Sequence, residues 1–155
     1  MSYKNNKSRG IGLLELILSL AIIGSILLMA TRYYLQAQEG AKVAQATKMI
    51  STLVNASFKW LEANDDFNDL KNKNILVDAN ILPESWRDKK NPWAGLLEVV
   101  GYGADSQRLK ITLGGLSETA CENIDDIMSK QGMQLNKNCA DGSYVGIYPE
   151  IKNEQ

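Results

Sequence analysis

The chain has 155 residues and a mass of 17.2 kDa, which allows one modest globular domain beside any separate apolar segment. Its formal charge is −1, and removal of residues 1–10 leaves 14 basic and 18 acidic side chains, so the remainder lacks the excess of cations that non-specific nucleic-acid binding requires. The absence of histidine excludes a histidine-dependent catalytic triad and, with only two cysteines, argues against a zinc site.

The first predicted element is an apolar run over residues 11–30, preceded by a short basic segment that contains Lys4, Lys7 and Arg9. As a helix the run is about 30 Å long, which matches the hydrocarbon core of a bilayer. The basic residues predict that the N-terminus stays cytoplasmic and that the C-terminal part lies across the membrane. A cleaved secretory signal fits less well, because the run is long and no small-x-small cleavage site follows it.

One acidic residue, Glu15, interrupts the apolar run. A carboxylate in a membrane-spanning segment costs roughly 2.5–3.5 kcal/mol on insertion scales. We therefore expect Glu15 to have a charged partner or a function.

The helical pattern continues well beyond the apolar run. Residues 32–62 contain no proline and a single glycine, Gly40. Apolar or small residues recur there at helical spacing: Ala37, Ala41, Val43, Ala44, Ala46, Ile50, Leu53, Val54, Ser57 and Leu61. We predict one helix over residues 11–62, uniformly apolar in its first half and amphipathic in its second, and ended by the polar stretch 63–69.

The rest of the chain predicts a small α+β domain. Residues 64–91 are expected to form a loop-rich connection, with Trp86 and Trp93 as core or loop anchors. Strands are predicted at 96–101, 109–113, 133–138 and 143–148. A short helix should begin at Ser117 or Thr119 and end near residue 130, with Thr119 and Glu122 as a capping box.

Two cysteines, Cys121 and Cys139, lie in this C-terminal part. If it is exported, as the basic N-terminal segment predicts, they should form a disulfide. The alternative, two buried thiols in a cytosolic domain, conflicts with that topology.

The N-terminal segment resembles the processing site and first helix of type IV pilins. The resemblance rests on Gly10, the apolar Ile11, Glu15 four positions later, and the run Ala21-Ile22-Ile23-Gly24. It implies cleavage after Gly10 by prepilin peptidase, methylation of the new Ile11 amine, and pairing of Glu15 with the Ile11 ammonium of a neighbouring subunit. Gly12 and Gly24 would permit close helix packing, and Gly24 would also permit local unwinding.

The globular part is similar to type IVb pilins, most closely the thin-pilus pilins of conjugative plasmids. The similarity rests on residues 80–83, 91–95, 109–116 and 120–121. The family turn asparagine-proline-tryptophan-glycine-glycine appears here with Ala94 in place of the first glycine, the leader is shorter than many type IVb leaders, and Ile11 is not the commonest first residue. The implied fold is a long N-terminal helix packed on a small antiparallel sheet, with a disulfide-closed C-terminal region.

The resemblance implies four segments: a cleaved leader (1–10), a transmembrane and polymerisation segment (11–31), an amphipathic helical segment (32–62) and a globular head (63–155). We expect a structural subunit of a type IV pilus, of the IVb class by resemblance, that serves adhesion, aggregation or conjugation. It would not be an enzyme and would use no cofactor or metal. It would lie in the bacterial inner membrane before assembly and in an extracellular pilus afterwards.

The expected partners are copies of the chain itself, prepilin peptidase, the assembly platform in the inner membrane, and the membrane before assembly; nucleic acid is not expected. Two alternatives stay open at this stage. The chain is a minor pilin or a pseudopilin of a type II secretion system, or it is a signal-anchored binding or enzymatic domain that never polymerises.

Overall fold

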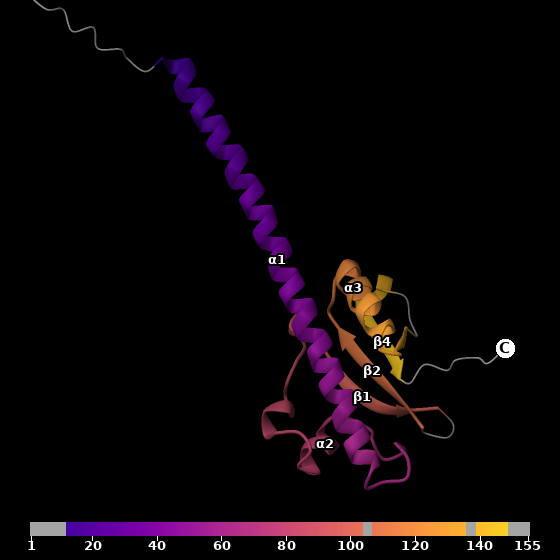
Figure 1. Cartoon of the computed structure of the whole chain (residues 1–155). Helices are drawn as coiled ribbons and strands as arrows, with labels where there is room; N and C mark the ends of the chain where they lie inside the picture. Colours follow the sequence, from indigo (N-terminus) through magenta and orange to yellow (C-terminus); the bar gives the residue numbers. More distant parts are fainter. Residues whose placement is uncertain (1–11, 104–106, 136–138, 149–155) are drawn as a thin grey trace, which may run out of the picture. The chain divides into compact units, whose positions relative to one another are not determined.

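The computed structural model describes residues 12–103, 107–135 and 139–148. The chain divides into two compact units, residues 1–38 and residues 39–155, and the second is called the head unit below. The first helix, α1 (Leu13–Leu61), passes through the boundary between the two units (Figure 1). The prediction of one helix over 11–62 is thus confirmed for the described residues.

Within the head unit, α1 buries one face. Its buried residues follow helical spacing: Val43, Ala46, Thr47, Met49, Ile50, Leu53, Ala56, Ser57 and Trp60. Five of them belong to the face predicted from the sequence. Ala41 and Ala44 of that predicted face are exposed, whereas Met49 and Trp60, which were not assigned to it, are buried.

The connection after α1 contains more structure than predicted. A short helix, α2 (Asn74–Asp78), and a 3-10 helix, η1 (Glu84–Trp86), interrupt the loop. Both contribute to the core, since Leu76 is fully buried and Trp86 is buried. Their position on one side of the head unit is visible in Figure 1.

The sheet has four antiparallel strands in the order β1-β2-β4-β3. The strands are β1 (Leu97–Tyr102), β2 (Arg108–Gly114), β3 (Gln134–Leu135) and β4 (Ser143–Tyr148). In β2 buried and partly exposed residues alternate along the whole strand, as expected for a sheet with one face on the core. The predicted strands are confirmed, although residues 136–138 of the third prediction lie outside the described residues.

A third helix, α3 (Glu118–Ser129), and a 3-10 turn, η2 (Cys139–Asp141), complete the head unit. Ser117 caps α3 by accepting a hydrogen bond from the Ala120 amide at 3.2 Å. The predicted capping box is therefore wrong: with Ser117 as the cap, its reciprocal position falls on Ala120, which has no side-chain acceptor. Gly132 follows α3 with a φ of +82°, a conformation that favours glycine after a helix.

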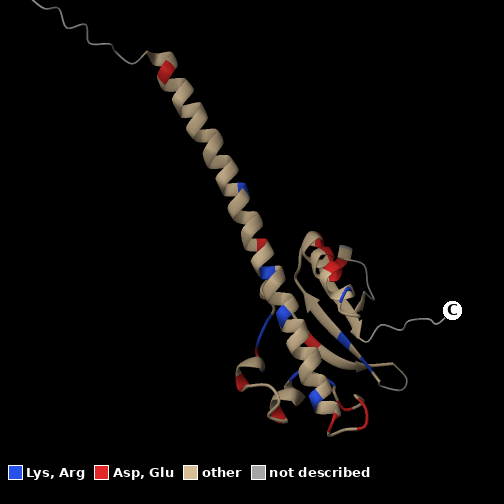
Figure 2. Ribbon diagram, in the orientation of Figure 1, with Lys and Arg blue, Asp and Glu red and all other residues tan. Residues whose placement is uncertain are grey.

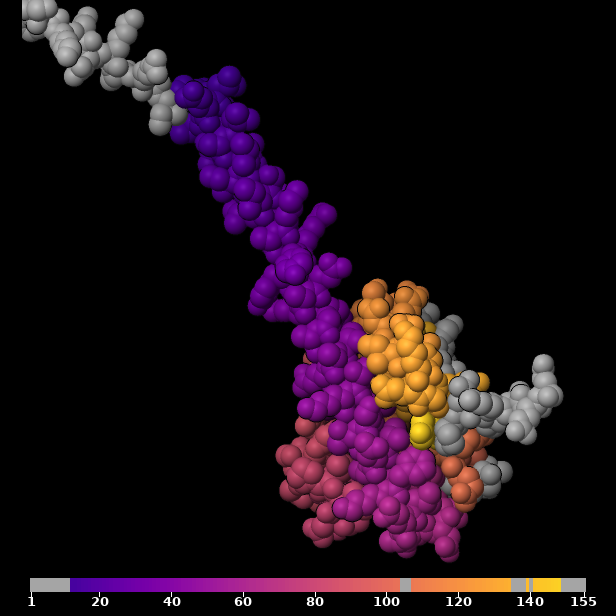
Figure 3. Space-filling model, viewed as in Figure 1, coloured from indigo at the N-terminus to yellow at the C-terminus, as the bar shows by residue number. Residues whose placement is uncertain are grey.

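One hydrophobic core joins these elements. It contains the buried face of α1, the inner positions of the sheet, and Ile124 and Met128 of α3. Figure 3 shows the head-unit part of α1 and α3 side by side on one face. The predicted α+β class, with the long helix packed on an antiparallel sheet, is confirmed.

Candidate functional site

The first part of α1 presents a largely apolar surface. None of the described residues before Glu39 is buried. Of the seventeen large apolar side chains that are exposed in the described chain, fifteen lie between Leu13 and Leu35. By length and composition this helix can cross a membrane, and such a surface requires lipid or protein around it.

Charge is almost absent from this segment. Between residues 12 and 31 Glu15 is the only charged residue, and the next is Arg32 (Figure 2). Glu15 lies in the first turn of α1, where its Oε2 accepts a hydrogen bond from the Gly12 amide at 3.3 Å. A carboxylate in this position is stabilised by the unpaired amides and the positive end of the helix dipole. Glu15 is therefore directed toward the start of its own helix.

The other polar side chains of the segment are hydrogen-bonded within the helix. The hydroxyls of Ser19, Ser25 and Thr31 donate to backbone carbonyls three or four residues earlier, at 2.8–2.9 Å. These bonds remove the cost of placing a hydroxyl in an apolar medium. The surface of the segment thus has one polar feature left, the carboxylate of Glu15.

The remaining residues predicted for this site have different outcomes. Gly10 and Ile11, the predicted cleavage and methylation positions, lie outside the described residues. At Gly12 and Gly24 an added Cβ would meet nothing within 4 Å. The chain itself therefore places no steric demand on either glycine, and their role in packing against other helices stays a prediction.

The head unit contains a polar centre built around Asn91, which the sequence analysis noted only as part of the turn 91–95. This side chain is 4% exposed. Its Nδ2 donates to the carbonyls of Leu96 (2.9 Å) and Gly114 (2.6 Å). Its Oδ1 accepts from the amides of Trp93 (2.9 Å) and Gly95 (3.0 Å). The amide uses both its donors and its acceptor, and so joins the turn before β1 to the end of β2.

Backbone geometry explains the glycine pattern of this turn. Ala94 has a φ of +59°, in the left-handed region that disfavours side chains with a Cβ. A Cβ on Gly95 would lie 1.8 Å from the Gly114 carbonyl oxygen. Glycine is thus required at position 95, whereas alanine at position 94 carries backbone strain.

Glu39 connects three elements of the head unit. Its Oε1 accepts hydrogen bonds from the Trp93 indole at 3.0 Å and from the Ser117 hydroxyl at 3.4 Å. The first residue of the head unit is in this way bonded to the turn before β1 and to the cap of α3. Sequence analysis missed this contact because 54 and 78 positions separate the partners.

The disulfide Cys121–Cys139 closes the C-terminal region, as predicted. Its Cα atoms are 5.6 Å apart, and the two residues join α3 to η2. Both cysteines are buried, so the bond is part of the core.

Three titrating groups of the head unit have pKa values that burial shifts. Burial lowers the pKa of Lys73, whose ammonium donates to the carbonyls of Lys89 (2.6 Å) and Leu97 (3.1 Å). Burial raises the pKa of Tyr144 well above its usual value, and the nearby charge of Asp125 adds to this effect. Burial also raises the pKa of the Asp125 carboxyl, with the Asp126 charge as a second cause.

Comparison of the sequence with protein-family models gives no match, and comparison with curated proteins gives none. The function of the chain is therefore inferred from the residues and geometry above.

Proposed function

We propose that this chain is a structural subunit of a type IV pilus-like filament, held in the inner membrane by α1 and polymerised through the same segment. The observation that carries the proposal is the exposed apolar part of α1 with one carboxylate in its first turn. Support also comes from the α+β head unit with its C-terminal disulfide, which is the architecture that the sequence resemblance implies.

The exposed apolar surface of α1 favours both membrane insertion and association with other helices. Burial of one large apolar side chain is worth about 1.5–3 kcal/mol, so the fifteen exposed side chains between Leu13 and Leu35 represent on the order of 20–40 kcal/mol. In a monomer only lipid can supply this stabilisation. In a filament the same segments of other subunits cover the apolar surface. The helix can then leave the membrane without exposure to water.

Glu15 gives such an assembly its register. A buried carboxylate is tolerated when an opposite charge meets it and strongly disfavoured when none does. Cleavage after Gly10 would create an ammonium at Ile11, next to the Gly12 amide that Glu15 contacts. A neighbouring helix whose first turn lies beside Glu15 offers that charge at one axial offset only. When identical subunits repeat a contact that includes an axial offset, the assembly cannot close into a ring and grows into a helical filament.

The first test is the N-terminal residue of the protein isolated from its native host, determined by mass spectrometry. The proposal predicts a mature chain that begins at a methylated Ile11. A chain that keeps Met1 or Ser2 at its start would overturn it in favour of a signal-anchored domain.

The second test is the substitution Glu15→Ala. It should leave membrane insertion and export intact while filaments on the cell surface, counted by electron microscopy, are lost. Ser19→Ala is the matched control, since it alters a hydroxyl on the next turn that is already bonded within the helix. Normal filaments in the Glu15→Ala variant would contradict the proposal. If the processed chain is found in only a few copies within filaments that consist mainly of another subunit, it would be a minor pilin or a pseudopilin instead.

A further inference from the structure

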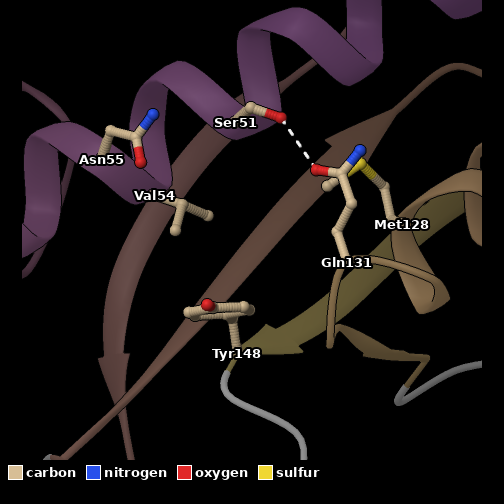
Figure 4. A pocket seen from close by; sticks show the side chains of 6 residues that line it. All are labelled: Ser51, Val54, Asn55, Met128, Gln131 and Tyr148. Carbon is tan, nitrogen blue, oxygen red and sulfur yellow. Dashed lines mark hydrogen bonds between the residues drawn. The ribbon is translucent and has the colours of Figure 1, made fainter.

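A small pocket opens in the head unit between α1 and the segment that follows α3. Its volume is about 170 Å³, and its lining residues come from α1, from α3 and the turn after it, and from the end of β4: Ser51, Val54, Asn55, Met128, Gln131 and Tyr148 (Figure 4). No charged side chain is among them. The pocket is not used by the proposed assembly segment, so its role is a separate question.

An aromatic ring forms one wall of this pocket. Figure 4 shows the Tyr148 ring nearly edge-on, so that one of its faces is turned toward Val54 and the neighbouring α1 side chains. The ring is held by Phe58, whose centroid lies 5.7 Å away at an interplanar angle of 84°. Phe58 packs in turn on Phe67 at 5.6 Å and 89°. Two successive edge-to-face contacts thus fix the plane of Tyr148 before any ligand arrives.

The polar groups of the pocket have hydrogen-bonding capacity to spare. The Ser51 hydroxyl lies 3.2 Å from the Gln131 Oε1 and 3.0 Å from the Thr47 carbonyl. Among the described residues, the Gln131 amide nitrogen and both polar atoms of the Asn55 side chain have no hydrogen-bond partner. Each amide nitrogen carries two donors, and the Asn55 carbonyl adds an acceptor.

The size and chemistry of the pocket select a ligand class. A cavity of about 150 Å³ accommodates one six-membered ring, so a pocket of about 170 Å³ has room for a single ring. Because the lining is neutral, a charged ligand would lose hydration without a counter-charge. A purely apolar ring would form no hydrogen bond with the exposed amides of Asn55 and Gln131, whereas a ligand with hydroxyl groups can bond to both.

We propose that this pocket binds one uncharged pyranose ring, such as the terminal sugar of a surface glycan. The polarised C–H bonds on one face of a pyranose match the negative face of the Tyr148 ring. Its vicinal hydroxyls both donate and accept, which matches the planar amides of Asn55 and Gln131. The inference does not depend on polymerisation, because all six lining residues belong to the head unit.

The test uses the full chain in micelles of an alkyl phosphocholine detergent, which contain no sugar. Saturation-transfer difference NMR is recorded with the methyl pyranosides of glucose, galactose, mannose and N-acetylglucosamine, and with phenol as an apolar ring. A ligand this small is expected to bind with a Kd of about 1 mM. At least one pyranoside should bind, with the strongest transfer to the ring C–H protons that face Tyr148.

Two variants and one control decide where binding occurs. Asn55→Ala and Gln131→Ala should each weaken the binding of that sugar about three- to tenfold, as expected for the loss of hydrogen bonds. Both residues are exposed at the rim, so the fold should be retained. The control Asn123→Ala removes an exposed helical asparagine of α3 and should change nothing. Binding of phenol alone, no binding of any pyranoside at about twenty times the expected Kd, or sugar binding that neither amide variant weakens would overturn the proposal.

Discussion

Replacement of Asn91 by alanine removes the polar centre of the turn that enters the sheet. The side chain makes four hydrogen bonds of 2.6–3.0 Å to backbone groups. Alanine can replace none of them, and the carbonyls of Leu96 and Gly114 would lose a donor at a site that is 4% exposed in the native protein. The substitution also releases the restraint that holds Ala94 at a positive φ.

The magnitude follows from the number of bonds. A typical intramolecular hydrogen bond contributes about 1 kcal/mol net, and a buried group left without a partner costs more. Four bonds therefore predict a loss of about 3–4 kcal/mol in the free energy of unfolding. With a denaturant dependence of about 2 kcal/mol per M urea for a protein of this size, the unfolding midpoint should fall by about 1.5–2 M.

The assay is urea denaturation of the full chain in micelles, followed by the fluorescence of the tryptophans, all three of which lie in the head unit. Asn123→Ala, an exposed asparagine of α3, serves as the control and should shift the midpoint little. The reasoning would be refuted by an Asn91→Ala midpoint within about 0.5 M of the control. Such a result would mean that water replaces the Asn91 amide at little cost.

Three further changes test other parts of the head unit by the same denaturation assay. Ala94→Gly should raise the free energy of unfolding by about 1 kcal/mol, because glycine relieves the strain at φ +59°; an unchanged or lower midpoint would contradict this. The disulfide joins residues 18 positions apart in the sequence. Its loss in the double variant Cys121→Ser and Cys139→Ser should lower the free energy of unfolding by about 3 kcal/mol. Equal melting temperatures of the native protein with and without reductant would argue against this. The pKa of Asp125 is raised in the folded protein, which means that ionisation of this carboxyl opposes folding. The stability that the protonated carboxyl contributes at low pH is therefore lost as pH rises through the folded-state pKa. Asp125→Asn should therefore stabilise the protein at about pH 7 but not at about pH 3, below the unfolded pKa, and a gain of equal size at both pH values would show that the charge is not responsible.

The elements that the sequence predicted are those with long or alternating patterns. The helix over residues 11–62 was predictable because this helix-compatible stretch contains no proline and few glycines. The strands β1, β2 and β4 agree with their predicted ranges to within one residue at each end. In each case the residue pattern repeats along the whole element, so the prediction does not depend on any single residue.

The elements that the sequence did not predict are short and depend on distant contacts. Helix α2 has five residues and η1 has three, too few to show a period. They form because Leu76 and Trp86 are drawn into the core, and that information lies in the elements they pack against. The cap of α3 shows a related limit: both Ser117 and Thr119 suit an N-cap by residue type, and in the structure Ser117 is the cap and its hydroxyl also contacts Glu39.

The candidate sites divide in the same way. Glu15 was recognisable from sequence because a lone carboxylate is costly in an apolar run that can cross a membrane. Glu39 carries no such signal, since a glutamate in an amphipathic helix is ordinary, and Asn91 was noted only as part of the turn 91–95 without a role for its side chain. Their importance comes from hydrogen bonds to backbone and side chains far along the chain, which only the folded arrangement provides.

The composition of α1 explains how one helix can serve two roles. Its buried face begins at Val43 and supports the head unit, whereas the residues before Glu39 are exposed and belong to the other compact unit. A substitution such as Glu15→Ala therefore removes no contact of the head-unit core, and the urea midpoint of the head should not change. Filament loss with an unchanged midpoint would assign the defect to assembly, whereas filament loss with a lowered midpoint would assign it to folding. The same separation lets a variant such as Asn91→Ala be interpreted as a change in the head unit alone.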